Sequence, residues 1–118
     1  MVVTSQFLWR AGCFLGATGV ALGAFGAHGL AKHVDNDPKK LKMWETAAHY
    51  QLFHSAVLLA ASLGRKTNAA GPLLIAGTAF FSGSIYLLVL DKERFRPLGP
   101  VTPLGGLCLI GGWVALLF

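Results

Sequence analysis

The segment WETAAHYQLFH, residues 44–54, holds most of the side chains in this sequence that could do chemistry. On a regular helix Glu45 and His49 lie one turn apart on one face, within reach of each other. His54 falls on the opposite side of the same helix, close to Tyr50. An ionised Glu45 could hold a neighbouring histidine as imidazolium or fix its tautomer. The segment therefore predicts a polar site on one helix, with groups facing several directions.

Residues from other segments could join this site. His28, near the end of the preceding apolar segment, returns to the depth of Glu45 and His49 if the two segments form a helical hairpin. Ser82 and Tyr86 lie one helical turn apart in a later segment and are candidate hydrogen-bond partners. The candidate polar cluster comprises His28, Glu45, His49, Tyr50, Gln51, His54, Ser82 and Tyr86.

Several roles are open to this cluster. Its members could form only interhelical hydrogen bonds, each worth about 0.6 kcal/mol in a membrane. They could also bind a small molecule such as a quinone or handle protons, because ionisable groups at membrane depth indicate function by default. His49 and His54 diverge on a helix, which is poor geometry for one metal or haem, so we predict no metal and no cofactor. The serines lack a nucleophile-elbow context, so we predict no catalytic residue.

The elements that must position these residues are long and apolar. Charged residues make up 13% of the sequence and hydrophobic residues 54%, and the mean hydropathy is +0.59. Four stretches contain no Asp, Glu, Lys or Arg: 11–31, 46–64, 67–90 and 97–118. Each reaches the roughly 18 to 25 residues that a helix needs to cross about 30 Å of hydrocarbon.

Two other architectures fit these stretches poorly. A soluble helical core would show a polar stripe on most helices, and the last two stretches have too little polarity for one. A strand barrel would need alternating segments of about ten residues. We therefore predict an all-α integral membrane protein, a four-transmembrane-helix bundle. It forms a single membrane domain over residues 1–118, with helices of about 8–30, 38–64, 69–90 and 102–118.

Basic residues are distributed unevenly between the two ends of such a bundle. The connections after the first and third helices hold Lys32, Lys39, Lys40, Lys42, Lys92, Arg94 and Arg96. The opposite side holds only Arg10, Arg65 and Lys66. The positive-inside rule therefore predicts that both connections face the cytoplasm or matrix, with both termini on the outer side. The net charge is +5, but the basic residues lie at the borders of membrane segments and are not interleaved with aromatic residues on a soluble surface. No nucleic-acid partner is therefore expected.

Local signals mark where two of the helices begin. Asp37 can cap the second helix, and Pro38 suits its first helical position. Thr102 and Pro103 are expected to do the same for the fourth helix. Trp44 lies where a residue of the interfacial aromatic belt is expected.

The first helix carries the clearest packing pattern. Five glycines spaced four, three, four and three residues apart share one narrow face: Gly12, Gly16, Gly19, Gly23 and Gly26. A second small face runs through Cys13, Ala17, Ala21, Ala24 and His28, and the fourth helix has a shorter strip in Gly105, Cys108, Gly112 and Ala115. Small residues let helix backbones approach closely in lipid. They predict packing within the bundle, in a homo-oligomer or against a larger membrane protein complex, with the lipid bilayer around the remainder.

Several blocks of the sequence resemble one known family. They are GAFGAHGL (23–30), WETAAHYQLFHSAVLL (44–59), FSGSIYLL (81–88), LGPVTPLGG (98–106) and GGW (111–113). In this order they resemble the transmembrane protein 256 family, small four-helix membrane proteins of unknown function, and the resemblance covers nearly the whole chain. It implies a four-span domain in the mitochondrial inner membrane of a eukaryote or the plasma (inner) membrane of a bacterium. It supplies no reaction.

The function expected from the sequence is therefore that of a membrane protein without enzymatic activity. The leading interpretation is a helix-packing module or an accessory subunit of a larger membrane assembly. The alternative is a protein that binds a quinone, a lipid or another apolar small molecule at the inner-side His/Glu/Tyr cluster.

Overall fold

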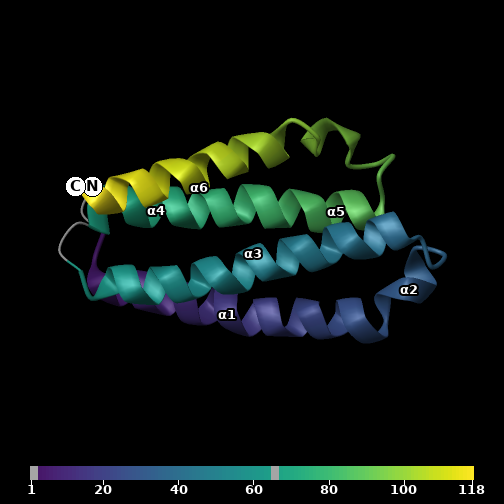
Figure 1. Cartoon of the computed structure of the whole chain (residues 1–118), viewed down its shortest axis with the longest axis horizontal. Helices are drawn as coiled ribbons and strands as arrows, with labels where there is room; N and C mark the ends of the chain where they lie inside the picture. Colours follow the sequence, from purple (N-terminus) through teal and green to yellow (C-terminus); the bar gives the residue numbers. More distant parts are fainter. Residues whose placement is uncertain (1–2, 65–66) are drawn as a thin grey trace.

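The structure is a computed structural model that describes residues 3–64 and 67–118. Its helices form four antiparallel rods (Figure 1). The first rod is α1 (Ser5–His28), which is followed by the short α2 (Leu30–His33), and the second is α3 (Pro38–Ser62). The third contains α4 (Thr67–Thr78), the π-helix η1 (Ala79–Gly83) and α5 (Ser84–Leu90). The last consists of the 3₁₀ turn η2 (Arg96–Leu98) and α6 (Val101–Leu117).

The all-α prediction is confirmed for the described residues, which contain no strand. Three helical segments are long and apolar enough to cross a membrane: Ser5–His28, Asn68–Leu90 and Arg96–Leu117. Helix α3 is not among them, and it carries the polar residues of the candidate cluster at positions 45–54. The fourth span and the sidedness of the termini therefore stay predictions.

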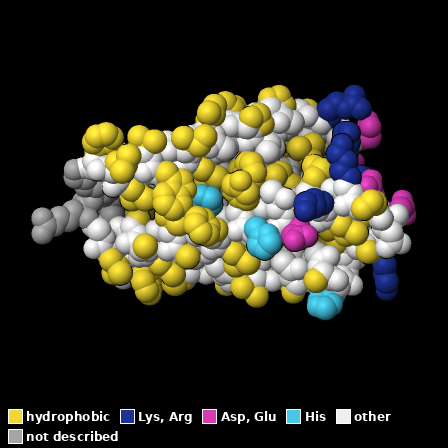
Figure 2. All heavy atoms as spheres, viewed as in Figure 1, with side chains coloured by type: hydrophobic (Ala, Val, Ile, Leu, Met, Phe, Trp, Pro, Cys, Tyr) yellow, Lys and Arg dark blue, Asp and Glu magenta, His cyan; other side chains and the backbone are white. Residues whose placement is uncertain are grey.

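Most charged side chains gather at one end of the molecule, where α2, the start of α3 and η2 lie (Figure 2). We call this the charged end. The rest of the visible face is mainly hydrophobic. The start of α1 and the end of α6 both lie at the opposite end (Figure 1). This segregation is what a rod-shaped bundle needs if its middle is to lie in hydrocarbon.

The glycine face of α1 packs against α3. All five glycines, Gly12, Gly16, Gly19, Gly23 and Gly26, have their nearest neighbours on that helix. A Cβ added at Gly12 would lie 2.9 Å from the carbonyl oxygen of Ser55, and one at Gly26 would lie 2.5 Å from Cδ1 of Trp44. Contacts this short leave no room for a side chain, so the face that predicted close packing is occupied within the chain.

A second close approach joins α6 to the third rod. A Cβ at Gly105 would overlap the backbone nitrogen of Phe81 and lie 2.8 Å from the carbonyl carbon of Phe80. Both residues belong to η1, where the helix widens into a π turn. At Gly112 a Cβ would lie 2.7 Å from Cδ2 of Leu74. Two glycines of the predicted strip on the fourth helix thus seat α6 on α4 and η1.

Trp44 corrects one expectation about the interface with the membrane. Its side chain is 2% exposed and lies in the core near Tyr86, so it is not a residue of the aromatic belt. Its Nε1 donates to the carbonyl oxygen of Leu22 at 2.8 Å. Gly26 provides the space for the indole ring, and this is why a large aromatic residue can be buried between α1 and α3.

The two predicted caps have different outcomes. Asp37 caps α3 as expected, because its side chain accepts from the backbone nitrogen of Lys39 at 3.0 Å. Thr102 does not cap α6, which begins one residue earlier, at Val101. Its hydroxyl instead forms a hydrogen bond with that of Ser84, between α6 and α5. An interhelical partner has thus replaced the local backbone partner.

Candidate functional site

Gln51 forms the centre of a buried hydrogen-bond network that joins three rods. Its Nε2 donates to the carbonyl oxygen of Leu15 at 2.9 Å and to Oγ1 of Thr18 at 2.8 Å, both on α1. Its Oε1 accepts from the hydroxyl of Tyr86 on α5 at 2.7 Å. Gln51 is 4% exposed and Tyr86 8%. Every polar atom of the amide side chain is therefore used to hold helices together.

Ser82 also forms a buried hydrogen bond between two helices. Ser82 is 1% exposed, and its hydroxyl donates to the carbonyl oxygen of Ala47 at 2.7 Å, which links η1 to α3. Ser55 and Ser62 donate to carbonyl oxygens of their own helix, at 2.6 Å each. Thr78 has a buried hydroxyl for which no partner lies among the described residues. These hydroxyl groups act in packing, and none is placed as a nucleophile beside a base.

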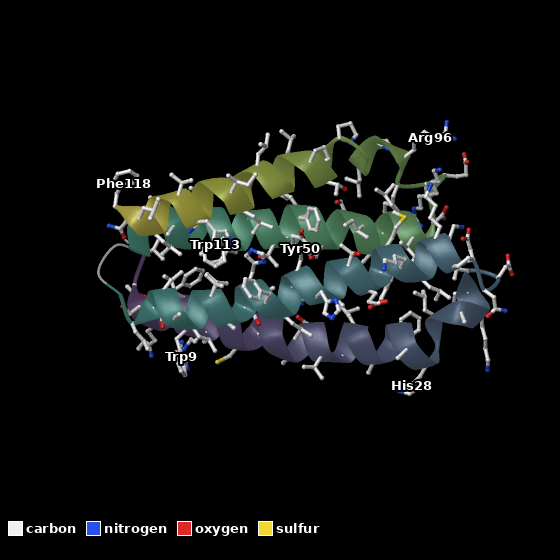
Figure 3. The ribbon with its side chains drawn as sticks, viewed as in Figure 1. Trp9, His28, Tyr50, Arg96, Trp113 and Phe118 are labelled. Carbon is white, nitrogen blue, oxygen red and sulfur yellow. The ribbon has the colours of Figure 1, made fainter. Side chains whose placement is uncertain are left out.

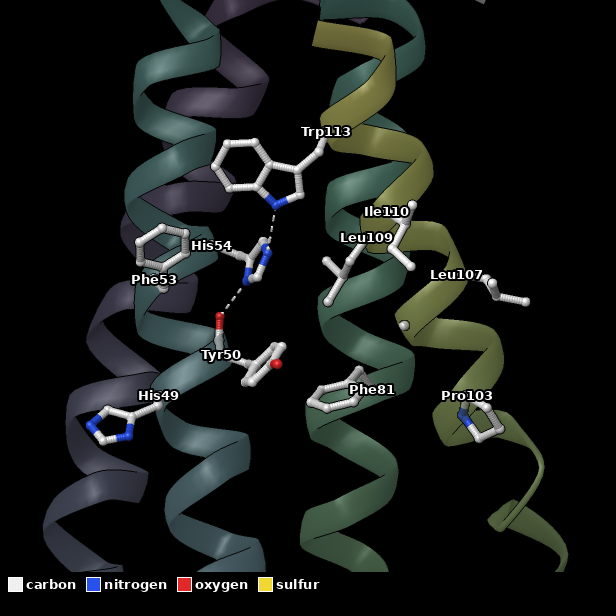
Figure 4. A pocket seen from close by; sticks show the side chains of 11 residues that line it. His49, Tyr50, Phe53, His54, Phe81, Pro103, Leu107, Leu109, Ile110 and Trp113 are labelled. Carbon is white, nitrogen blue, oxygen red and sulfur yellow. Dashed lines mark hydrogen bonds between the residues drawn. The ribbon is translucent and has the colours of Figure 1, made fainter.

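His54 lies between α3 and α6 with both ring nitrogens engaged (Figure 4). Trp113 Nε1 donates to Nε2 at 3.1 Å, and Nδ1 lies 2.7 Å from the carbonyl oxygen of Tyr50. Indole nitrogen can only donate and a carbonyl can only accept. His54 is therefore the neutral tautomer that carries its proton on Nδ1. It is 5% exposed, so neither nitrogen is available to a ligand.

An open groove lies beside this histidine, and we call it the α3–α6 groove. Its α3 wall is formed by His49, Tyr50, Phe53 and His54, and its α6 wall includes Pro103, Gly106, Ile110 and Trp113, with Phe81 of η1 also lining it. It encloses about 870 Å³, which lies within the range of about 300–1,000 Å³ typical of ligand pockets. The groove exists because α6 packs on α4 and η1 whereas α3 packs on α1.

The groove is mainly apolar, and Tyr50 brings a polar group into it (Figure 4). The ring of Tyr50 packs on Phe81, with 4.6 Å between centroids, and 44% of the residue is exposed. The Tyr50 hydroxyl and the His49 ring form no hydrogen bond with any residue in the described part of the chain. Such a site can take an apolar body and offer hydrogen bonds to one polar group on it.

Glu45 and His49 also line a smaller hollow of about 330 Å³ between α1 and α3. Both are exposed, and within residues 3–64 and 67–118 neither forms an ion pair or hydrogen bond. His28 lies on the outer surface near the end of α1 and points away from the bundle (Figure 3). The structure thus brings Glu45 and His49 together but leaves His28 apart. In the same ranges no three His, Cys, Asp or Glu residues could hold a metal.

Sequence reasoning missed two partners of the candidate residues, Thr18 and Trp113. Thr18 is a polar residue in the apolar stretch 11–31, so its type gave a signal that it would seek a partner on another helix. Trp113 is 59 residues from His54, and nothing local to either residue indicates their pairing.

Known proteins resemble this chain over most of its length. The DUF423 family, described as proteins of unknown function, matches residues 22–106. A UPF0382 membrane protein of Schizosaccharomyces pombe is 46% identical over 116 residues, which cover 93% of this chain and 98% of the relative. UPF0382 membrane protein SH2409 of Staphylococcus haemolyticus is 42% identical over 103 residues, which cover 83% of this chain and 81% of the relative.

A more distant relative is the UPF0382 inner membrane protein YgdD of Escherichia coli. It is 35% identical over 121 residues, covering 98% of this chain and 89% of the relative. No solved structure matches the chain. The resemblance seen in the sequence blocks is confirmed, since the transmembrane protein 256 family is the eukaryotic branch of DUF423. The chain therefore belongs to the DUF423 family and is an integral membrane protein.

Proposed function

We propose that the chain crosses the membrane four times, with both termini on the outer side. Helix α3 packs against α1 and the third rod, so it shares their environment if those rods span the bilayer. Its 25 residues give about 37 Å at about 1.5 Å per residue, enough to cross about 30 Å of hydrocarbon. Two of the polar residues that keep the hydropathy of α3 below that of a typical span, Gln51 and His54, are hydrogen-bonded in the interior.

The function that the geometry supports best is non-enzymatic binding of an apolar molecule in the α3–α6 groove. The observation that carries this proposal is an apolar groove of about 870 Å³ whose Tyr50 hydroxyl has no partner among the described residues. Within a bilayer this opening faces hydrocarbon, so an amphiphile can enter it from the side. The compartment would be the mitochondrial inner membrane in a eukaryote or the plasma membrane in a bacterium.

This site differs from the inner-side cluster expected from the sequence. His49, Tyr50 and His54 line the groove, whereas Glu45 does not and His28 lies on the outer surface. Because both nitrogens of His54 are engaged, it serves to close the groove against Trp113. The Tyr50 hydroxyl would contact a carbonyl or hydroxyl of the bound molecule, whereas the His49 ring points away from α6 (Figure 4).

A leucine at Gly106 tests this proposal. Gly106 lines the groove, and a Cβ there would lie 3.8 Å from Cδ1 of Phe81, an ordinary contact, so a larger side chain would fill the groove without disturbing α6. Gly83→Leu is the matched control, because a Cβ at Gly83 meets nothing within 4 Å and the residue lies outside the groove. Protein purified from native membranes in mild detergent would be examined by native mass spectrometry for bound small molecules.

We expect wild type and Gly83→Leu to carry the same apolar molecule and Gly106→Leu to lose it at least severalfold. Equal content of bound molecules in the three proteins would remove the basis for the proposed function.

A second candidate function is that of an accessory subunit in a larger assembly or homo-oligomer. It rests on the second small face of α1, where Cys13, Ala17, Ala21 and Ala24 are exposed on the outer surface of the bundle. Small residues favour close approach of another helix in lipid. Crosslinking in native membranes would capture a neighbour through this face, and Ala21→Leu would weaken the capture. Strictly monomeric behaviour with no crosslinked neighbour would exclude this candidate.

A further inference from the structure

The α3–α6 groove is followed, toward the charged end, by a second hollow on the same side of α3. This hollow encloses about 430 Å³ and is lined by Pro38, Lys39, Lys42, Met43, Thr46 and Ile85. We call it the lysine hollow. Thr46 lies one helical turn before the groove residue Tyr50, and Ile85 lies about one turn after the groove residue Phe81. The two hollows therefore succeed each other along the seam between α3 and the third rod.

The lysines of this hollow are poorly explained by the protein itself. The first turn of α3 contains no acidic residue, so its lysines oppose the helix dipole and weaken the helix. Lys39 and Lys42 are exposed and form no ion pair with any described residue. The ion pair found in the described part of the chain joins Arg96 and Glu93, in the loop before α6. Lys39 and Lys42 are thus free to meet an anion from outside the protein.

One face of α3 consequently changes character in a fixed order. It begins with Lys39 and Lys42, continues through the hydroxyl of Thr46 to Tyr50, and ends in the aromatic Phe53. From Lys42 to Tyr50 the helix rises about 12 Å, at about 1.5 Å per residue. The ring of Phe53 stacks on Trp113 with 5.9 Å between centroids, and the groove beside these rings is lined by Phe81 and Ile110. The sequence of cation, hydroxyl and apolar surface is complementary to a phosphate, an ester region and an acyl chain.

We propose that the groove holds one anionic phospholipid of the inner leaflet. Its phosphate lies at Lys39 and Lys42, and its ester carbonyls accept from Thr46 and Tyr50. One acyl chain runs along the groove over Phe81 and Ile110, toward the stacked rings of Phe53 and Trp113. The inference rests on the proposed function, and it specifies the bound molecule.

Two other occupants fit this surface less well. An uncharged quinone would leave both lysines without a counter-charge. A transmembrane helix of a second copy would need small residues for close approach. The walls of the groove present the large side chains of Tyr50, Phe53 and Trp113 instead.

The test uses the full chain in nanodiscs that contain equal amounts of phosphatidylglycerol and phosphatidylcholine with the same acyl chains. After release into mild detergent, native mass spectrometry measures the fraction of protein that retains one lipid of each class. We expect a preference of about tenfold for phosphatidylglycerol, because each basic residue near the surface attracts anionic lipid. Lys39→Gln with Lys42→Gln should bring the ratio close to one. Both side chains are exposed, so the bundle should remain folded.

The matched control is Arg94→Gln with Arg96→Gln, which removes the same charge from the same end of the molecule. Both arginines are exposed and lie outside the lysine hollow and the groove. We expect the control to keep the wild-type preference. An equal loss of preference in both double variants would show a general surface effect and overturn the inference.

Two further outcomes separate this inference from the proposed function. If wild type shows no lipid preference, or retains only an uncharged molecule, while Gly106→Leu still empties the groove, the inference fails and the proposed function stands. If Gly106→Leu retains as much lipid as wild type, the groove is not the binding site and both fail.

Discussion

At the scale of single residues, His54 shows how a titratable group can be structural. Its Nε2 accepts from Trp113 and its Nδ1 donates to the carbonyl oxygen of Tyr50, so the neutral ring fits both partners. A second proton on Nε2 would oppose the indole N–H and break the contact between α3 and α6. The role of this histidine is therefore to join two helices at the edge of the groove.

The tautomer of His54 can be read directly by NMR. We expect ¹⁵N shifts of the wild-type ring to show a protonated Nδ1 and an accepting Nε2. Trp113→Phe removes the donor to Nε2, so the Nε2 shift should move to that of a ring nitrogen without a hydrogen bond, while Nδ1 stays protonated against the carbonyl oxygen of Tyr50. Trp9→Phe is the control, because Trp9 is an exposed residue of α1 and should leave the His54 signals unchanged. A wild-type ring protonated on Nε2 would contradict the assignment.

Two buried hydroxyls of the third rod should respond in opposite ways to their removal. Ser82→Ala leaves the carbonyl oxygen of Ala47 without its partner and should cost about 1 kcal/mol of unfolding free energy. Thr78→Val removes a buried hydroxyl that has no partner among the described residues, so it should be neutral or stabilising. Unfolding midpoints in mixed micelles would measure both. A larger loss from Thr78→Val than from Ser82→Ala would contradict this reading of the two hydroxyls.

At the scale of helices, the packing of the bundle depends on the positions where two helix backbones come into contact. Gly105 and Gly106 are neighbours on α6 but face different surroundings. At Gly105 a Cβ would overlap the nitrogen of Phe81, whereas at Gly106 it would lie 3.8 Å from a side-chain carbon of the same residue. Packing requires a glycine at position 105, whereas the glycine at position 106 leaves space in the groove.

Alanine at these two positions gives a matched comparison. We expect Gly105→Ala to cost about 1–3 kcal/mol of unfolding free energy, because α6 must move away from η1 to accept the methyl group. Gly106→Ala should be neutral or stabilising by up to about 1 kcal/mol, since alanine favours the helix more than glycine does. Thermal unfolding in the same detergent would rank the variants. Equal midpoints would mean that α6 does not seat on η1 as closely as described.

Local periodicity accounts for what the sequence could predict at this scale. The in-phase glycines of α1 indicated a close-packing face, and the charge-free stretches indicated long apolar helices. The partner of that face could not be predicted, because α3 and any helix of another molecule satisfy the same pattern. The π turn at Ala79–Gly83 and the pairing of His54 with Trp113 depend on how α6 lies against the third rod. Neither feature can be predicted from the residues next to it in the sequence.

At the scale of the whole molecule, the number of spans decides the sidedness of the termini. Three spans would place the two ends of the chain on opposite sides of the membrane, and four would place them on the same side. Hydropathy favours three, because α3 is too polar for a typical span. Packing favours four, because α3 lies against α1 and the third rod and its buried Gln51 and His54 have interhelical partners.

Single cysteines at four exposed positions distinguish these topologies. With both native cysteines replaced by alanine, cysteine would be placed in turn at Ser5, Asp35, Asn68 and Phe118, and labelled from one side with a membrane-impermeant maleimide. We expect Ser5, Asn68 and Phe118 to react from the outer side and Asp35 from the inner side, because each rod crosses once. Permeabilised membranes, in which all four positions should react, control for local accessibility. Labelling of Asn68 from the same side as Asp35 would show that α3 does not cross. The lysine hollow and the Trp113 end of the groove would then not lie at different depths of one bilayer, as a seated phospholipid requires.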